Sequence, residues 1–165
     1  MTRWLLVALL LALAGGCTVG PTDIQYGKDT CASCRMQITD PRFGSELVTR
    51  HGKAYTFDAV ECLVGFTLRG TVPAAETHSV WVSDFANPGH LIDARTARYL
   101  RTDAVRSPMG LNVLAFAGEA EREAARGRYQ GEAISWEQLP EVVRQGAVLE
   151  RRMGGAEGPA PARPH

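Results

Sequence analysis

The longest uninterrupted apolar stretch of the chain lies near its N-terminus, where Arg3 is followed by apolar residues from position 4 to position 14. A membrane-spanning helix needs roughly 20 apolar residues, so this stretch is too short to be one. A positive residue, a short apolar segment and small residues are typical of a secretory signal. We therefore predict that residues 1–16 are a signal peptide and that the rest of the chain is exported.

The segment that ends this stretch, Ala14-Gly15-Gly16-Cys17, resembles the bacterial lipobox, in which a cysteine after small residues receives a lipid. Ala14 departs from the usual Leu three residues before that cysteine, and the alternative is an ordinary cleaved signal. We expect Cys17 to carry a lipid that anchors the protein to a membrane of the cell envelope, facing the periplasm or the exterior. Residues 17–29 contain Pro and Gly, lack apolar periodicity and are expected to be a spacer.

Apolar patterning after the spacer predicts one strand–strand–helix–strand unit. A helix is expected to open at Asp58, because Asp58 is a good N-cap and Glu61 three residues later completes a capping box. Short apolar segments before and after this helix predict strands. The expected elements are strands at residues 45–51, 54–57 and 79–83, and a helix at residues 58–68.

A second unit of the same kind is predicted in the rest of the chain, where Ser135 is expected to cap the last helix. The fold class is therefore α+β, with two small ββαβ-type units at about residues 30–86 and 87–150. Residues 151–165 are dominated by Gly, Ala and Pro and are expected to be a disordered tail. The elements of the second unit are strands at residues 98–101, 111–116 and 132–135, and helices at residues 118–126 and 136–149.

Charge and composition exclude several classes of function. The 18 Lys and Arg residues balance the 18 Asp and Glu residues, so nothing favours a nucleic-acid partner, which needs a clustered basic surface. We find no nucleophile elbow, phosphate-binding loop or HExxH pattern, and we expect no enzymatic activity. With Cys17 assigned to the anchor, the three remaining cysteines are an odd number in a compartment that favours disulfides. At least one of them is therefore unpaired or bound to a ligand.

Two of these cysteines form a CxxC motif, Cys31 and Cys34, and Met36 adds a thioether two residues later. Thiolate and thioether sulfur are soft donors that suit copper(I). A disulfide within the motif and a thiol-disulfide oxidoreductase are alternatives, although the motif does not open a helix after a strand as in thioredoxin-like proteins. Covalent haem attachment is excluded because Arg35 follows the second cysteine.

Two further sulfur atoms are candidate donors. Cys62 falls one turn into the predicted helix, where it is either a buried structural residue or a ligand. Met109 lies in the segment Ser107-Pro108-Met109-Gly110, a predicted tight turn, where a methionine is less easily explained by core packing. Three histidines, His51, His78 and His90, are borderline assisting donors, and each is more simply explained as a solvated side chain.

Taken together, these motifs resemble the NosL family, a group of lipoproteins accessory to nitrous oxide reductase. The resemblance spans about residues 29–117, with Arg35 where the family often has Gly and Ala59 where a second Asp is common. The motifs that carry it are CxxCxM, Arg42-Phe43, the Tyr-Thr-Phe-Asp-x-x-Glu-Cys stretch from Tyr55 to Cys62, Trp81-Val-Ser-Asp-Phe85, Ser107-Pro-Met-Gly110 and Ala115-Phe116.

The resemblance implies an extracytoplasmic copper(I) chaperone whose domain covers residues 30–150 and which delivers copper for the copper-sulfur centre of nitrous oxide reductase. It implies copper binding by Met109, with Cys31, Cys34 and Met36 as further ligands, and we add Cys62. The implied partner is a membrane copper-handling or assembly complex of the reductase. A homodimer is a further expectation, since copper(I) sites often form between two chains. The other classes that stay open are an oxidoreductase using Cys31 and Cys34 and a structural lipoprotein.

Overall fold

The computed structural model describes residues 20–154, with side chains described through residue 147. The predicted signal peptide, the lipid anchor at Cys17 and residues 155–165 of the predicted tail lie outside this part of the chain. Within residues 20–154, each helix is too short or too polar to cross a membrane.

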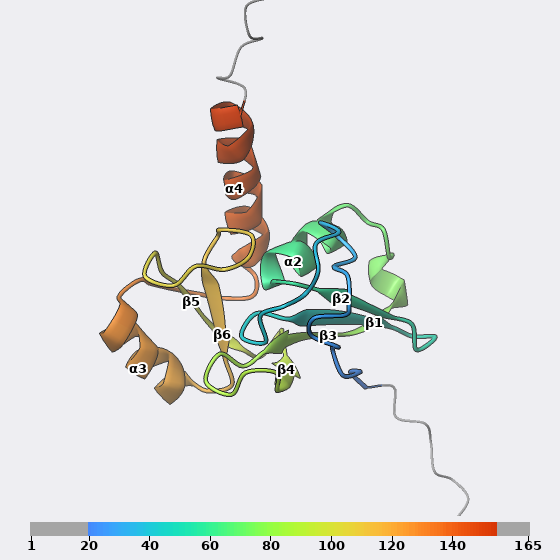
Figure 1. Cartoon of the computed structure of the whole chain (residues 1–165), viewed down its shortest axis with the longest axis horizontal. Coiled ribbons are helices and arrows are strands. Elements are labelled where there is room, and N and C mark those ends of the chain that lie inside the picture. The colour runs from blue at the N-terminus through green and yellow to red at the C-terminus, as the bar shows by residue number, and fades with distance from the viewer. Residues whose placement is uncertain (1–19, 155–165) are drawn as a thin grey trace, which may run out of the picture.

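The first unit is a four-stranded antiparallel sheet covered by one helix (Figure 1). Its central strand β1 has all five residues buried, because β2 and β3 flank it in the sheet and α2 packs against it. The strand order is β2-β1-β3-β4. The elements are β1 (Ser45–Thr49), β2 (Ala54–Phe57), α2 (Val60–Leu68), the 3₁₀ turn η1 (Ala74–Glu76), β3 (Thr77–Ser83) and β4 (Leu91–Asp93).

The second unit repeats this arrangement with a three-stranded sheet of order β6-β5-β7. As in the first unit, the first strand is central, the second pairs with it antiparallel, and the strand after the helix pairs on its other side. The helix α3 packs on β5 and β6. The elements are β5 (Arg98–Arg101), β6 (Val113–Phe116), α3 (Glu119–Tyr129), β7 (Glu132–Ile134) and α4 (Leu139–Gly154).

The predicted α+β fold with two ββαβ units is therefore confirmed, with differences at the edges. The structure adds β4, which pairs with β3, so that the first sheet extends to Asp93, past the expected boundary near residue 86. The helix α4 reaches Gly154, so the first residues of the predicted tail are helical.

Both predicted helix caps are wrong. The helix α2 begins at Val60 after Ala59, and no side chain caps it. The helix α4 begins at Leu139 instead of Trp136, because Pro140 is tolerated in a first turn, where its missing N–H has no intrahelical partner to lose. The backbone N–H of Ser135 donates to the side chain of Gln138 instead of Ser135 acting as the cap.

The two units share a hydrophobic core. One cluster of buried side chains joins Leu47 and Leu63 of the first unit to Tyr99 of the second and Leu139 at the start of α4. Figure 1 shows α4 standing beside α2 and extending away from both sheets, and the two helices are in contact. This contact places the start of α2, the loop between β5 and β6 and the first turns of α4 around one region of the molecule.

Candidate metal centre

The CxxC motif lies on a closed loop that precedes the first sheet. Its ends are joined by an antiparallel bridge between Thr30 and Gln37, and the backbone N–H of Cys31 donates to the carbonyl of Met36 at 2.8 Å. The loop is attached to β2 through the N–H of Ala32, which donates to the carbonyl of Thr56. Both cysteines are thereby held against the end of β2, where α2 begins.

Two further side chains reach the same place from the β2–α2 connection. Asp58 follows β2 directly, and Cys62 lies in the first turn of α2. Asp58 is buried, and its carboxylate accepts from the thiol of Cys34, with 3.2 Å between sulfur and Oδ2. Its other oxygen, Oδ1, is buried without a hydrogen-bond partner. The predicted capping role of Asp58 is absent because its side chain faces the cysteines.

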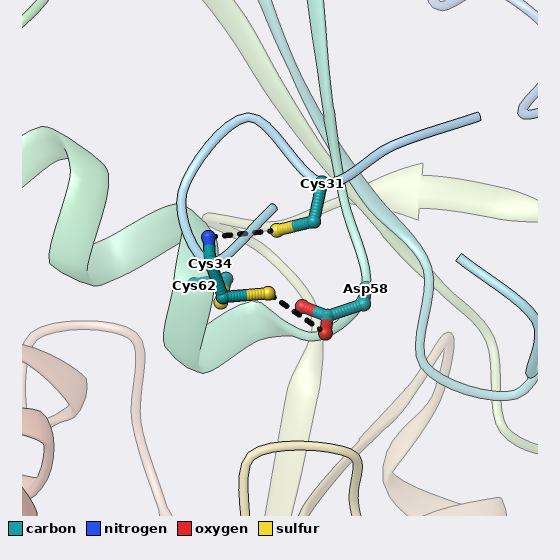
Figure 2. Close-up of side chains that lie close together, drawn as sticks. All are labelled: Cys31, Cys34, Asp58 and Cys62. Carbon is teal, nitrogen blue, oxygen red and sulfur yellow. Dashed lines mark hydrogen bonds between the residues drawn. The ribbon is translucent and has the colours of Figure 1, made fainter. Parts of the chain in front are cut away.

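Figure 2 shows the resulting cluster, in which the side chains of Cys31, Cys34, Asp58 and Cys62 converge. One potential ligand atom from each of the four residues lies within 4.8 Å of every other. Metal–thiolate bonds are about 2.3 Å long, so two sulfur atoms on opposite sides of one ion would be about 4.6 Å apart. All three thiols are free, and their spacing fits the coordination of a single ion.

The cluster gives its three thiols different acidities. The pKa of Cys31 is lowered to about 6, chiefly because the thiol of Cys62 donates to it, and the backbone N–H of Cys34 donates at 3.5 Å. Burial, together with Asp58, raises the pKa of Cys34 to about 11. The pKa of Cys62 is raised because its proton is shared with Cys31 and because it is buried beside Asp58. A thiolate at Cys31 is therefore stabilised by the protonated thiol of Cys62 and by the backbone N–H of Cys34.

A cavity of about 230 Å³ connects this cluster to Met109. Its lining includes Cys34 and Cys62 and also Met109, which comes from the β5–β6 loop. Met109 is half-buried and packs against the hydrophobic core. The remaining lining comes from the CxxC loop, α2, the β5–β6 loop and α4: Ser33, Glu61, Gly65, Arg69, Leu111, Val143, Gly146 and Ala147. The cavity thus brings sulfur from both units to one place.

Glu61 also faces this cavity and is buried in the first turn of α2. Its Oε1 accepts from the hydroxyl of Ser107 at 2.5 Å, and its Oε2 is buried without a partner. Burial raises the pKa of this carboxyl, and the Ser107 hydrogen bond partly offsets that effect. Glu61 was expected to complete a capping box, which is wrong because its side chain reaches the β5–β6 loop.

The structure brings together four of the five sulfur donors named from the sequence, Cys31, Cys34, Cys62 and Met109. Met36 is 47% exposed and does not line the cavity. The histidines His51, His78 and His90 are exposed and lie outside the cluster.

Sequence reasoning missed the two acidic members of the site, Asp58 and Glu61. Both lie in the stretch from Tyr55 to Cys62 that carries the family resemblance. Their closeness in sequence to Cys62 could have indicated that they belong to the site. Helix capping explained the same two residues, so this signal was not used.

The fold and the site define a class: an α+β protein of two ββαβ units with a thiol-rich candidate metal centre between the CxxC loop and α2. The sequence model of the NosL family matches residues 21–143. The chain belongs to the NosL family.

Two proteins with the name of that family are similar to the chain. It is 28% identical over 149 residues to the copper-binding lipoprotein NosL of Stutzerimonas stutzeri, covering 85% of this chain and 76% of that protein. Its fold matches the crystal structure of the copper chaperone NosL from Shewanella denitrificans with a TM-score of 0.59 and 24% identity, covering 72% of this chain and 96% of that one. These relatives are named for binding and carrying copper, in agreement with the expectation that the protein is not an enzyme.

Proposed function

We propose that this protein binds copper(I) at the cluster of Cys31, Cys34 and Cys62, with Met109 as a further donor, and passes the ion to another protein. The observation that carries the proposal is the shared cavity, whose lining includes Met109, Cys34 and Cys62. The names of the two relatives, a copper-binding lipoprotein and a copper chaperone, support the choice of metal.

The donor set favours a soft ion. Thiolates bind both copper(I) and zinc, whereas a thioether is a soft and uncharged donor that suits copper(I). Met109 needs no deprotonation to bind, while each protonated cysteine must release its proton. The stabilised thiolate of Cys31 supplies one negative charge before the ion arrives.

The unequal burial of the four sulfur donors supports transfer of the copper ion rather than its permanent storage. Cys31 and Cys62 are buried, whereas Cys34 and Met109 are partly exposed on the cavity wall. An acceptor protein can therefore approach the exposed donors first, and its own ligand can add to the ion before the buried thiolates leave. A closed site with four buried ligands, as in zinc ribbons, would resist this exchange.

The proposal extends to the protein that receives the copper and to the membrane anchor of this chain. The family resemblance supports delivery of copper for the copper-sulfur centre of nitrous oxide reductase, through a membrane-bound assembly complex. Lipidation at Cys17 would confine the chain to a membrane of the cell envelope on its periplasmic or exterior side. Confinement to the membrane raises the effective concentration of the chain at a membrane-bound acceptor.

A thiol-disulfide oxidoreductase is a weaker proposal for the same residues. Such enzymes place a reactive, exposed cysteine of the CxxC motif at a helix N-terminus. Here the motif lies on a loop, the acidic Cys31 is fully buried, and the more exposed Cys34 has a raised pKa.

The test is an anaerobic titration of the reduced full-length chain, in detergent, with copper(I) against a competing chelator. We expect one copper(I) per chain in the unmodified protein, a weaker affinity in Met109→Leu, and loss of binding when Cys31 and Cys62 are both replaced by Ser. Unchanged affinity in Met109→Leu would remove Met109 from the site. Retention of zinc but not copper(I) would contradict the proposed cargo.

A further inference from the structure

We propose that Glu61 is a positioning residue, which holds the loop of Met109 at a fixed distance from Cys62 of α2. This inference rests on the proposed copper(I) function and deepens it, because it names the residue that couples the thioether donor to the thiolate donors. Glu61 and Cys62 are neighbours in the first turn of α2, so whatever is attached to Glu61 is also held relative to Cys62.

The attachment is a hydrogen bond across the cavity wall. The hydroxyl of Ser107 donates to Oε1 of Glu61 at 2.5 Å and links positions 46 residues apart in the sequence. Both residues are buried, with Glu61 5% and Ser107 7% exposed. The backbone N–H of Val113, at the start of β6, also interacts favourably with this carboxyl. Glu61 therefore contacts both the β5–β6 loop and the strand that follows it.

The loop itself is held in one shape by its own hydrogen bonds. Ser107 and Asn112 are linked twice, through the N–H of Ser107 to Oδ1 of Asn112 at 3.1 Å and through the N–H of Asn112 to Oγ of Ser107 at 2.9 Å. The N–H of Gly110 donates to the carbonyl of Ser107. Pro108 fixes the backbone between Ser107 and Met109. The position of Ser107 therefore sets where the backbone of Met109 lies, from which its sulfur reaches the cavity.

These two facts give Glu61 its role. The internal bonds of the loop determine its shape, while the bond to Glu61 determines where that shape lies relative to Cys62. Without this bond, the loop can move away from α2, and metal binding must then restore the arrangement at an entropic cost. The copper(I) affinity should fall, although Glu61 itself donates nothing to the ion.

The experiment separates positioning from ligation by comparing two substitutions at one site. Glu61→Gln keeps a carbonyl oxygen that can accept from Ser107 but lacks the charge of a carboxylate ligand. Glu61→Leu has a similar size and no acceptor. We expect Glu61→Gln to bind copper(I) as the unmodified full-length chain does and Glu61→Leu to bind about tenfold more weakly, the loss typical of one buried hydrogen bond.

A double-mutant cycle identifies the donor through which Glu61 acts. In a Met109→Leu background, Glu61→Leu should cause no further loss of copper(I) affinity, because the positioned thioether is already gone. A loss of equal size in both backgrounds would overturn the proposal, since Glu61 would then act without Met109. An equal loss in Glu61→Gln and Glu61→Leu would also overturn it, since Glu61 would then be a ligand.

A measurement without metal keeps this inference separate from the proposed function. In the reduced, metal-free chain, the methyl NMR signal of Met109 should be unchanged by Glu61→Gln and should shift or broaden in Glu61→Leu. Ser107→Ala, which removes the donor to Glu61 and also the acceptor of the Asn112 N–H, should have at least as large an effect as Glu61→Leu and replaces that variant if it does not fold. An unchanged signal in the variants that lose the bond overturns positioning, whereas failure of the unmodified chain to bind copper(I) overturns the function alone.

Ser83→Ala is the matched control. The hydroxyl of Ser83 is buried and donates to the carbonyl of Pro41 at 2.5 Å, as the hydroxyl of Ser107 does to Glu61, but it lies outside the cavity lining. We expect Ser83→Ala to lower thermal stability while leaving both the Met109 signal and the copper(I) affinity unchanged. If it changes them as Ser107→Ala does, the effects reflect general loosening and the positioning role of Glu61 is refuted.

Discussion

The thiol of Cys34 donates to Oδ2 of Asp58 with 3.2 Å between sulfur and oxygen. A carboxylate beside a thiol opposes a second negative charge, so Asp58 adds to the effect of burial in raising the pKa of Cys34 to about 11. Of the three clustered thiols, the partly exposed one is therefore kept protonated. The donor most open to oxidants and alkylating reagents is the one held in its least reactive form.

Replacing Asp58 by Asn should make Cys34 more reactive. The charge that opposes the thiolate is removed, so the pKa of Cys34 falls, and each unit of fall raises the thiolate fraction at neutral pH about tenfold. We expect alkylation of Cys34 in the metal-free protein to accelerate several-fold, measured by peptide mass spectrometry against time.

Asp84→Asn is the control for this change. Asp84 is also buried, but it accepts from the backbone N–H of Ala86 and is not part of the thiol cluster. Cys34 should react in Asp84→Asn at the rate of the unmodified protein. An equal acceleration in both variants would mean that local loosening, and not the charge of Asp58, controls the thiol.

A second prediction concerns the pH at which the cluster first ionises. The pKa of Cys31 is lowered to about 6 from an ordinary value of 9.0, chiefly by the hydrogen bond from Cys62. Ultraviolet absorbance of the metal-free protein should show one thiolate forming near pH 6. Cys62→Ala removes the donor and should move this midpoint upward, whereas a midpoint unchanged in Cys62→Ala would contradict the assigned cause.

The same shift has a consequence for stability. Between pH 6 and 9 the unfolded chain holds a proton that the native Cys31 has released, so this group stabilises the native state increasingly as pH rises. Its contribution is complete above the ordinary pKa and is lost as pH falls through about 6. Chemical denaturation of the unmodified protein and of Cys31→Ser across this range should show a pH-dependent difference of that sign.

The sequence predicted the fold well where apolar positions form a continuous or periodic pattern. The strand β1 is buried at every position, and its residues Leu47 and Val48 made it visible as an apolar segment. The strand β4 was missed because it has three half-buried residues and forms only through its pairing with Val82 and its neighbours on β3. The three residues of β4 show no alternation of apolar and polar side chains that would identify a strand.

The sequence predicted which donor atoms the candidate site contains, but not how the fold brings them together. Sulfur chemistry indicated Cys31, Cys34 and Met36, since soft donors in an exported chain favour a soft metal. Met109 was indicated by its predicted tight turn and by the family resemblance. That Met109 and Cys62 line the same cavity depends on packing between the two units, which local sequence patterns do not encode. Asp58 was misassigned because an acid before a helix is an equally good cap, and only the tertiary structure shows its contact with Cys34.

A further prediction comes from the backbone of the CxxC loop. Arg35 has φ of 68°, a left-handed conformation that costs a residue with a side chain roughly 1–2 kcal/mol. Arg35→Gly should therefore stabilise the protein by about 1 kcal/mol after the greater entropy of an unfolded glycine is subtracted. For a chain of this size, the melting temperature should rise by roughly 2–4 °C.

Arg35→Ala is the matched control, because it removes the same side chain and keeps the Cβ atom. Its melting temperature should not rise. Equal stabilisation by Gly and Ala would show that the charge or bulk of Arg35, and not its backbone conformation, is unfavourable.

The last prediction separates the two methionines that the sequence offered as ligands. Met36 is 47% exposed and lies outside the cavity, whereas Met109 lines it beside Cys34 and Cys62. In a chelator competition, Met36→Leu should therefore leave the copper(I) affinity unchanged, while Met109→Leu lowers it about tenfold or more, the loss of one soft donor. X-ray absorption should show fewer sulfur neighbours around copper in Met109→Leu only. A loss of affinity in Met36→Leu as large as in Met109→Leu would require the CxxC loop to turn Met36 toward the ion on binding, and the site inferred from the metal-free cavity would then be incomplete.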